Sequence, residues 1–168
     1  MKKTGLILVV FALLFGCAST GQSPVVGKDA PDFSITDVSG EEVRLSNFKG
    51  QKNVVLVFYA DSKWSLSSRR LGELQEKISE IETINAEVIA FATSGNQDDV
   101  ETSKSVQEIT FTLIPKPNRK VVEDFGLKYD SFGAVYATII IDKGGIIRFK
   151  NVYNIDSASR IIIELQGI

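Results

Sequence analysis

The sequence predicts one α/β domain built on a central mixed sheet, with a short β-hairpin at its N-terminal end. Two observations lead to this prediction. From residue 27 onward, short apolar runs alternate with amphipathic stretches, as in domains that pack helices against a sheet. The 168 residues are 43% hydrophobic and 24% charged, which suits one globular core.

The first part of the domain is expected to hold the hairpin and the innermost strand. Residues 33–36 and 42–45 are short extended pieces joined by a turn sequence. Residues 54–59 are apolar without interruption, which is typical of a strand buried on both faces, so we place it near the centre of the sheet. Residues 66–81 carry Leu and Ile at three- and four-residue steps, which predicts one helix with a buried face.

A second strand and helix follow. Residues 87–93 are apolar and β-branched, and the turn at 94–96 leads into a predicted helix that ends near Gln107. Residues 111–114 are again extended. The prolines within 115–117 then make the chain leave the sheet at a turn.

The last part of the domain predicts a helix, a hairpin and a final helix. Residues 120–125 form a short helix that Gly126 is placed to cap. Asp-Lys-Gly-Gly at 142–145 is a hairpin turn, and Ser157 can cap the final helix. The predicted elements are strands 137–141 and 146–152 and a helix that runs to about residue 165.

Composition excludes several function classes. The chain has no His, which removes the usual imidazole base and the commonest metal ligand. It has one Cys, so no intrachain disulfide and no thiolate metal cluster can form. The net charge is −2 without a basic run, which argues against nucleic acid. We therefore expect no metal, no cofactor and no nucleic-acid partner.

The N-terminal residues predict export and lipid attachment. Residues 1–16 have a basic start and an apolar run that is shorter than the roughly 20 residues of a spanning helix. The run ends Leu-Phe-Gly before Cys17, which resembles the lipobox of bacterial lipoproteins, where the signal peptide is removed and the Cys is acylated. The alternative is an uncleaved anchor with a free Cys. Residues 17–25 then form a tether, and residues 26–168 form the folded domain.

Lipid attachment implies a location. We expect the protein in the bacterial cell envelope, held to membrane lipid through Cys17. Ala18 rather than Asp follows the Cys, which by resemblance to Gram-negative lipoproteins favours the outer membrane, facing the periplasm, if the host is Gram-negative.

Four phrases give a family resemblance. Residues 27–33 are similar to the pattern G-x-x-A-P-x-F, residues 43–50 to V-x-L-S-D-F-K-G, and residues 136–145 to a closing A-T-F-x-I-D-x-x-G hairpin. Together with strand 54–59, they resemble the peroxiredoxin-like family of alkyl hydroperoxide reductases and thiol-specific antioxidants, also called redoxins. The resemblance implies a thioredoxin-like three-layer fold, and relatives that are thiol-dependent peroxidases and thiol-disulfide oxidoreductases.

The family's reactive Cys stands at the start of the helix after strand 54–59, because a helix N-terminus favours the thiolate. Aligned on Trp64 as W-C-x-x-C, Ser65 and Ser68 occupy the two cysteine positions. Aligned as the peroxiredoxin pattern T-x-x-C, Trp64 stands at the Thr and Ser67 at the peroxidatic Cys. Both alignments place a Ser where the family has its nucleophile.

A second departure lies at Tyr136, where relatives carry a cis-Pro or an Arg. A cis bond before a residue other than Pro costs about 3 kcal/mol, so we expect a trans peptide there. A serine nucleophile would need a base, and without His the candidates are Lys63, Asp61 or a distant carboxylate. The simpler interpretation is a polar helix start, with Arg69 and Arg70 as solvated charges or, alternatively, as an anion site.

These observations predict a redox-inactive binding module, because a Ser hydroxyl neither forms disulfides nor ionises near pH 7. We expect no catalytic residue and a protein partner in the envelope. The alternative is a family-type antioxidant or oxidoreductase that works through a partner's cysteines or through Cys17.

Overall fold

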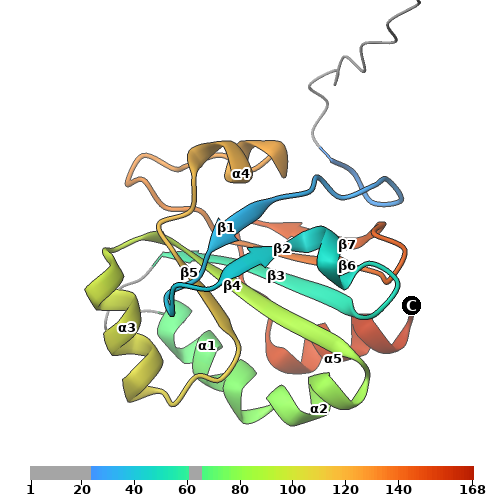
Figure 1. Ribbon diagram of the computed structural model, residues 1–168, viewed down its shortest axis with the longest axis horizontal. Helices are drawn as coiled ribbons and strands as arrows, with labels where there is room; N and C mark the ends of the chain where they lie inside the picture. Colours follow the sequence, from blue (N-terminus) through green and yellow to red (C-terminus); the bar gives the residue numbers. More distant parts are fainter. Residues whose placement is uncertain (1–23, 61–65) are drawn as a thin grey trace, which may run out of the picture.

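A computed structural model describes residues 24–60 and 66–168 and places a five-stranded mixed sheet at the centre of the molecule (Figure 1). The strand order is β5-β4-β3-β6-β7, with β3, β4 and β5 parallel and β6 and β7 antiparallel to their neighbours. Every residue of β3 is buried, which confirms the predicted central strand. The strands are β3 (Asn53–Ala60), β4 (Ala86–Ser94), β5 (Thr112–Pro115), β6 (Ala137–Ile141) and β7 (Ile147–Val152).

The predicted N-terminal hairpin forms a separate two-stranded antiparallel sheet, β1 (Ser34–Thr36) and β2 (Glu42–Arg44). Its turn is closed by the carboxylate of Asp37, which accepts the backbone N–H groups of Ser39 and Glu41 at 2.8 and 2.9 Å. Such an Asx turn is the local reason for a hairpin at this point. A 3₁₀ turn, η1 (Leu45–Phe48), then leads into β3.

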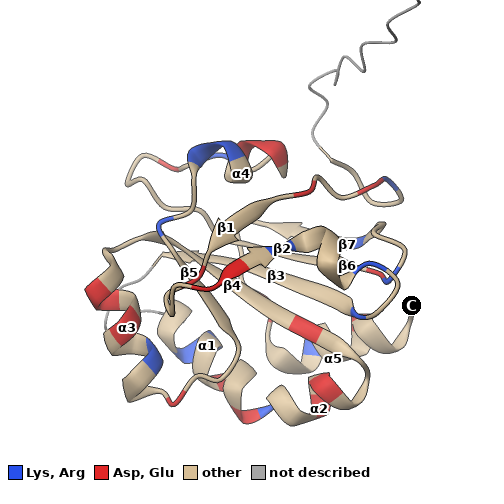
Figure 2. Ribbon diagram, in the orientation of Figure 1, with Lys and Arg blue, Asp and Glu red and all other residues tan. Residues whose placement is uncertain are grey.

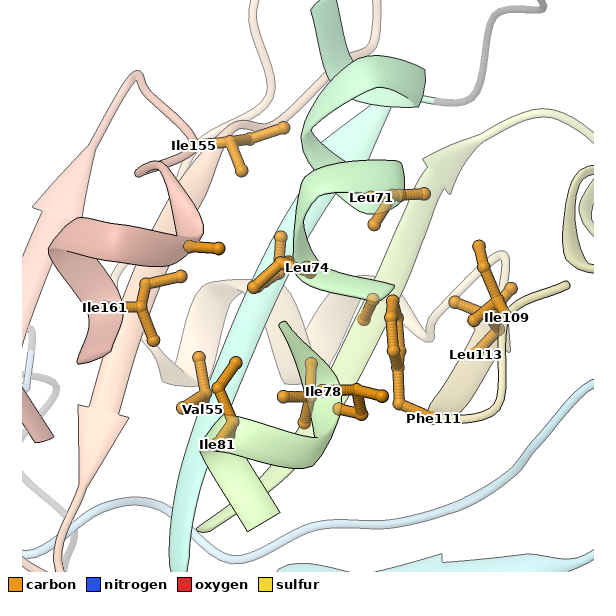
Figure 3. Close-up of a cluster of buried hydrophobic side chains, with 14 of the residues drawn as sticks. Val55, Leu71, Leu74, Ile78, Ile81, Ile109, Phe111, Leu113, Ile155 and Ile161 are labelled. Carbon is orange, nitrogen blue, oxygen red and sulfur yellow. The ribbon is translucent and has the colours of Figure 1, made fainter. Parts of the chain in front are cut away.

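Helices and hairpin cover opposite faces of the sheet and make three layers, as predicted (Figure 1). On one face, Leu71 and Leu74 of the first helix and Ile161 of the last helix belong to one buried cluster with the strand residue Val55 (Figure 3). The other face carries α4 and the hairpin over Phe58 and its neighbours. The helices are α1 (Leu66–Glu76), α2 (Ile78–Thr83), α3 (Gln97–Val106), α4 (Arg119–Asp124) and α5 (Ala158–Gln166).

The helix that was predicted to run without a break over 66–81 is two helices. Lys77 leaves helical geometry, with φ −107° and ψ 6°, and its N–H bonds to the carbonyl of Leu74, three residues back, at 3.1 Å. Ile78 and Ile81 nevertheless stay in the same buried cluster as Leu74 (Figure 3). The apolar period therefore predicted the buried face correctly and missed the break.

The predicted helix ends are confirmed. The Asn96 side chain accepts the N–H of Asp99 at 2.9 Å in a capping box at the start of α3. Ser157 accepts the N–H of Arg160 at 3.3 Å at the start of α5. Gly126 follows α4 with φ +64°, a conformation that favours Gly.

The β6–β7 hairpin is fixed by Asp142 in its turn. This carboxylate accepts the N–H of Ile146 at 2.9 Å and pairs with Arg148 at 2.5 Å. Burial raises the pKa of Asp142, but the backbone hydrogen bond and Arg148 lower it by more, so the pKa of this carboxyl lies below its usual value.

The chain joins the folded body beside β7. Gly27 donates its N–H to the carbonyl of Ile147 at 2.8 Å, and Ala30 donates to Gly145 at 2.8 Å. The ammonium group of Lys150 donates to the carbonyls of Pro24 at 3.0 Å and Phe125 at 2.8 Å. Within residues 24–60 and 66–168, no helix has the length and apolarity needed to span a bilayer.

Candidate functional site

The candidate site lies where β3 ends and α1 begins. β3 ends at Ala60 and α1 begins at Leu66, so the start of the helix follows the carboxyl end of the central strand. In the register of the sheet, Phe58 lies opposite Phe91 of β4 and Ala137 of β6. The ends of β3 and β4 and the beginning of β6 therefore meet at one edge of the sheet. Trp64 and Ser65 lie outside the described residues.

Ser67 and Ser68 occupy the first turn of α1. Ser67 is only 2% exposed. Ser68 is half-buried, and its hydroxyl accepts a hydrogen bond from Nε2 of Gln107 at 3.1 Å. N–H groups in a first helical turn have no partner within the helix. The two hydroxyls therefore stand where a helix can favour an anion, although neither hydroxyl can supply a thiolate.

Arg70 differs from the solvated charge that the sequence suggests. Arg69 is 68% exposed, whereas Arg70 is only 23% exposed at its side chain. Its Nη1 donates to Glu73 at 2.5 Å. Its Nε is buried and has no hydrogen-bond partner among the described residues. A buried donor without an acceptor is uncommon in folded proteins.

Thr93 is a buried residue of the site that the sequence gives no reason to select. Its hydroxyl donates to the carbonyl of Tyr59 at 2.9 Å and accepts the N–H of Val135 at 3.1 Å. The carbonyl of Val135 lies 3.3 Å away. This hydroxyl links the ends of β3 and β4 to the segment that precedes β6. A Thr near the end of an apolar strand is the only signal in the sequence.

Tyr136 precedes β6 at the same edge of the sheet. The peptide bond before it is trans, as predicted. Its side chain is half-buried against the cluster that contains Leu71 of α1, and its carbonyl accepts the N–H of Tyr153 at 2.7 Å. The structure thus brings Ser67, Ser68 and Tyr136 to one end of the sheet. No group of three or more acidic, His or Cys residues that could hold a metal occurs among the residues described.

Relatives by sequence are peroxiredoxins. A family profile described as the AhpC/TSA family matches residues 26–150. Peroxiredoxin Q from the chloroplast of Oryza sativa subsp. japonica is 28% identical over 145 residues, which cover 82% of this chain and 65% of the rice protein. Alkyl hydroperoxide reductase E of Mycobacterium bovis is 29% identical over 130 residues, covering 76% of this chain and 84% of that protein. The chain thus spans slightly less than two thirds of the rice relative's length.

Solved structures share the fold. The crystal structure of peroxidoxin BcpB from Mycobacterium tuberculosis superposes with a TM-score of 0.76 at 18% identity, over 86% of this chain and 98% of that chain. The reduced 2-Cys peroxiredoxin of Plasmodium vivax superposes with a TM-score of 0.73 at 22% identity, over 84% and 94%. Both likenesses concern the fold alone. With the match over residues 26–150, they place the chain, by sequence and by fold, in the AhpC/TSA family of thioredoxin-fold, peroxiredoxin-like proteins.

Proposed function

We propose that the chain is a lipid-anchored envelope protein whose folded domain has no thiol redox activity and serves as a binding module. The observation that carries this proposal is that the single Cys lies outside the region that matches the family. The only Cys of the chain is Cys17, and the family match begins at residue 26. The domain that relatives use for thiol chemistry therefore contains no thiol.

Serine does not replace the missing thiol. A free Cys has a pKa of about 8.5 that a helix start lowers, whereas a Ser hydroxyl stays protonated near neutral pH. Ser65, Ser67 and Ser68 remain the positions that match the family's nucleophile, in either alignment. None of them can form the disulfide or the oxidised sulfur on which peroxide reduction depends.

The start of α1 is the binding surface that we assign to this module. The buried Nε of Arg70 has no partner among the described residues, and Ser67 and Ser68 stand three and two residues before it. A carbonyl or carboxylate oxygen of a ligand would satisfy the guanidinium group. We therefore expect an oxygen-rich ligand, such as an extended segment or acidic side chain of an envelope protein.

Activity measurements test the first half of the proposal. The full chain is isolated from host membranes, and the mass of its N-terminal peptide is determined together with its peroxide and insulin-disulfide reduction in the presence of dithiothreitol. The expected result is an acylated Cys17 and turnover equal to the blank. Clear turnover by the acylated protein contradicts a redox-inactive domain.

Crosslinking tests the second half. A photoreactive amino acid at Ser68 is expected to give a defined adduct in membranes, and the adduct should disappear when Arg70→Ala is added. The matched control carries the photoreactive group at Ile163, which is exposed on α5. Equal adducts at both positions contradict binding at the start of α1.

A second candidate function is the thiol-dependent chemistry named for the relatives. Alkyl hydroperoxide reductase E and the peroxiredoxins favour it by their names. In this chain it requires Cys17 as a free thiol or cysteines supplied by a partner. Labelling of Cys17 by a maleimide in native membranes supports this alternative, and a fully acylated Cys17 removes its intramolecular form.

A further inference from the structure

Large exposed apolar side chains occur on the segment that enters the fold, at the end of β7 and on the loop between α4 and β6. Phe132 is 91% exposed and Tyr153 is 82% exposed, values that are unusual for aromatic side chains. We call the group the tether-side patch. It consists of Val25, Val26, Phe132, Val152 and Tyr153.

Hydrogen bonds hold the two valines beside the end of β7. Gly27 donates to Ile147 at 2.8 Å, and Ile147 donates to Lys28 at 2.9 Å, so this segment runs antiparallel to β7. Pro24 consequently faces Lys150, whose ammonium group donates to its carbonyl at 3.0 Å. Val152 and Tyr153 follow Lys150 by two and three residues in the chain. The point where the tether leaves is therefore next to the exposed end of β7.

The aromatic members are presented by ordered backbone. The carboxylate of Asp130 accepts the N–H groups of Phe132 at 2.8 Å and Ala134 at 2.9 Å, which closes the turn that carries Phe132. A hollow of about 320 Å³ lies beside this turn, with Leu127 and Tyr153 among its walls. The turn that carries Phe132 is thus ordered, and the hollow beside it has both apolar and polar walls.

The tether limits how far the folded body can stand from a membrane that holds Cys17. Residues 18–23 separate Cys17 from Pro24, and an extended chain reaches at most about 3.6 Å per residue, or about 25 Å in total. We propose that the tether-side patch rests in the interfacial layer of the bilayer that holds Cys17. This inference depends on the lipid anchor proposed above.

The chemistry of the patch suits that layer. Aromatic side chains concentrate at the boundary between headgroups and acyl chains, and large exposed apolar patches mark interaction surfaces. Side chains of both charges lie on the neighbouring helix α4 (Figure 2). Lipid headgroups also carry both charges, so they can pair with the charged side chains beside the patch. The remaining exposed large hydrophobic residues lie on α3 and near the C-terminus: Val106, Ile163 and Ile168.

Fluorescence quenching tests the inference on the full lipidated chain. Phe132→Cys introduces the only free thiol when Cys17 is acylated, and it is labelled with a fluorophore. The protein is placed in vesicles of phosphatidylethanolamine and phosphatidylglycerol that carry a nitroxide on the upper part of the acyl chain. The expected result is a loss of fluorescence at position 132. Adding Tyr153→Ser should reduce that loss.

The matched control is Ile163→Cys, a site 61% exposed on α5, on the opposite face of the sheet. No loss of fluorescence is expected there. Equal quenching at both positions, or none at position 132 in vesicle-bound protein, overturns the patch inference alone. The inference is also overturned if the loss of fluorescence at position 132 depends on protein concentration and not on nitroxide content. Such a result would show that a second copy of the protein covers the patch. Labelling of the unsubstituted chain shows a free Cys17 and overturns the anchor together with the patch.

Discussion

Thr93 shows how one hydroxyl can hold the edge of a site. It joins Tyr59 at the end of β3 to Val135 before β6 and is itself buried. Thr93→Val keeps the shape and leaves the N–H of Val135 without this acceptor. We expect a loss of about 1–3 kcal/mol in the free energy of unfolding, measured by urea denaturation. The exposed control Thr102→Val should change stability by less than about 0.5 kcal/mol. Equal losses for both variants would contradict the role assigned to Thr93.

Ser67 allows the helix start to be tested with a thiol. In Ser67→Cys, the first-turn N–H groups of α1 and the guanidinium of Arg70, three residues on, both favour a thiolate. Burial of position 67 opposes this effect, and we expect the helix start to outweigh it, so that the thiol pKa lies below the free value of about 8.5, as measured by pH-dependent alkylation.

Ser105→Cys provides the control, because it stands in the last turn of α3, where the helix disfavours an anion. Its thiol should titrate at or above the free value. If the Ser67→Cys thiol titrates no lower than this control, the helix start has lost the electrostatics of a thiolate site.

At the residue scale, the sequence identified those residues that stand in a family motif or that follow from composition. Ser67 and Tyr136 emerged from family spacing, and the structure places both at one end of the sheet. Thr93 did not, because its partners Tyr59 and Val135 are distant in sequence and the hydrogen bond depends on tertiary packing. Arg70 was indistinguishable from Arg69 for the same reason, since only the packing of α1 decides which of the two is buried.

At the scale of elements, the β6–β7 hairpin has a measurable pH dependence. The pKa of Asp142 is lowered in the folded state, so its contribution to stability is present above the unfolded pKa of about 3.9 and is lost as the pH falls through the folded pKa. Asp142→Asn should lower stability at pH 7 by about 1 kcal/mol. The difference from the unsubstituted protein should shrink below about pH 4, as followed by urea denaturation at several pH values.

An exposed carboxylate on another element gives the comparison. Glu82→Gln, on α2, should change stability by less than about 0.5 kcal/mol at pH 7. A cost for Asp142→Asn that stays constant from neutral pH to pH 3 is incompatible with the charge of Asp142 as its cause.

The hydrogen bonds that hold the first described residues beside β7 can also be tested. Burial lowers the pKa of Lys150, whose ammonium group holds Pro24 and Phe125. Lys150→Met keeps most of the apolar stem and removes both hydrogen bonds. We expect amide exchange at Gly27 to become about tenfold faster, which corresponds to about 1.4 kcal/mol of local opening free energy. Amide exchange at Ala30 should change less than at Gly27. The control Lys28→Met, at an exposed position of the same segment, should leave exchange at Gly27 and Ala30 unchanged.

Elements were predictable where the pattern is local. The apolar composition of residues 54–59 predicted a buried strand. Asn96 and Ser157 stand at helix starts, and their side chains cap those helices. The break at Lys77 was not predictable, because apolar residues continue at helical spacing through it. Apart from the central place of residues 54–59, the order of strands in the sheet was not predicted, because periodicity carries no information on which strands pair.

At the scale of the whole molecule, sulfur is confined to the N-terminal end of the chain. The chain has one Met, Met1, and one Cys, Cys17, so residues 18–168 contain neither. We expect peroxide at concentrations that convert Met to its sulfoxide to leave the intact mass of the acylated protein unchanged. Ser67→Cys serves as the positive control and should gain oxygen. Oxygen added to the unsubstituted protein anywhere except Trp64 contradicts this expectation.

The way the tether joins the fold also has a mechanical consequence. A protein held by one end transmits any pull on that end to the residues where the chain enters the body. Here Lys150 donates a hydrogen bond to the carbonyl of Pro24. Gly27 and Ala30 donate in turn to backbone carbonyls of β7 and of the β6–β7 turn. A load on the anchor is therefore shared by a strand of the main sheet before it reaches the small β1–β2 hairpin. If Cys17 is held by lipid as proposed, these bonds shield the β1–β2 hairpin from forces applied at the N-terminal end.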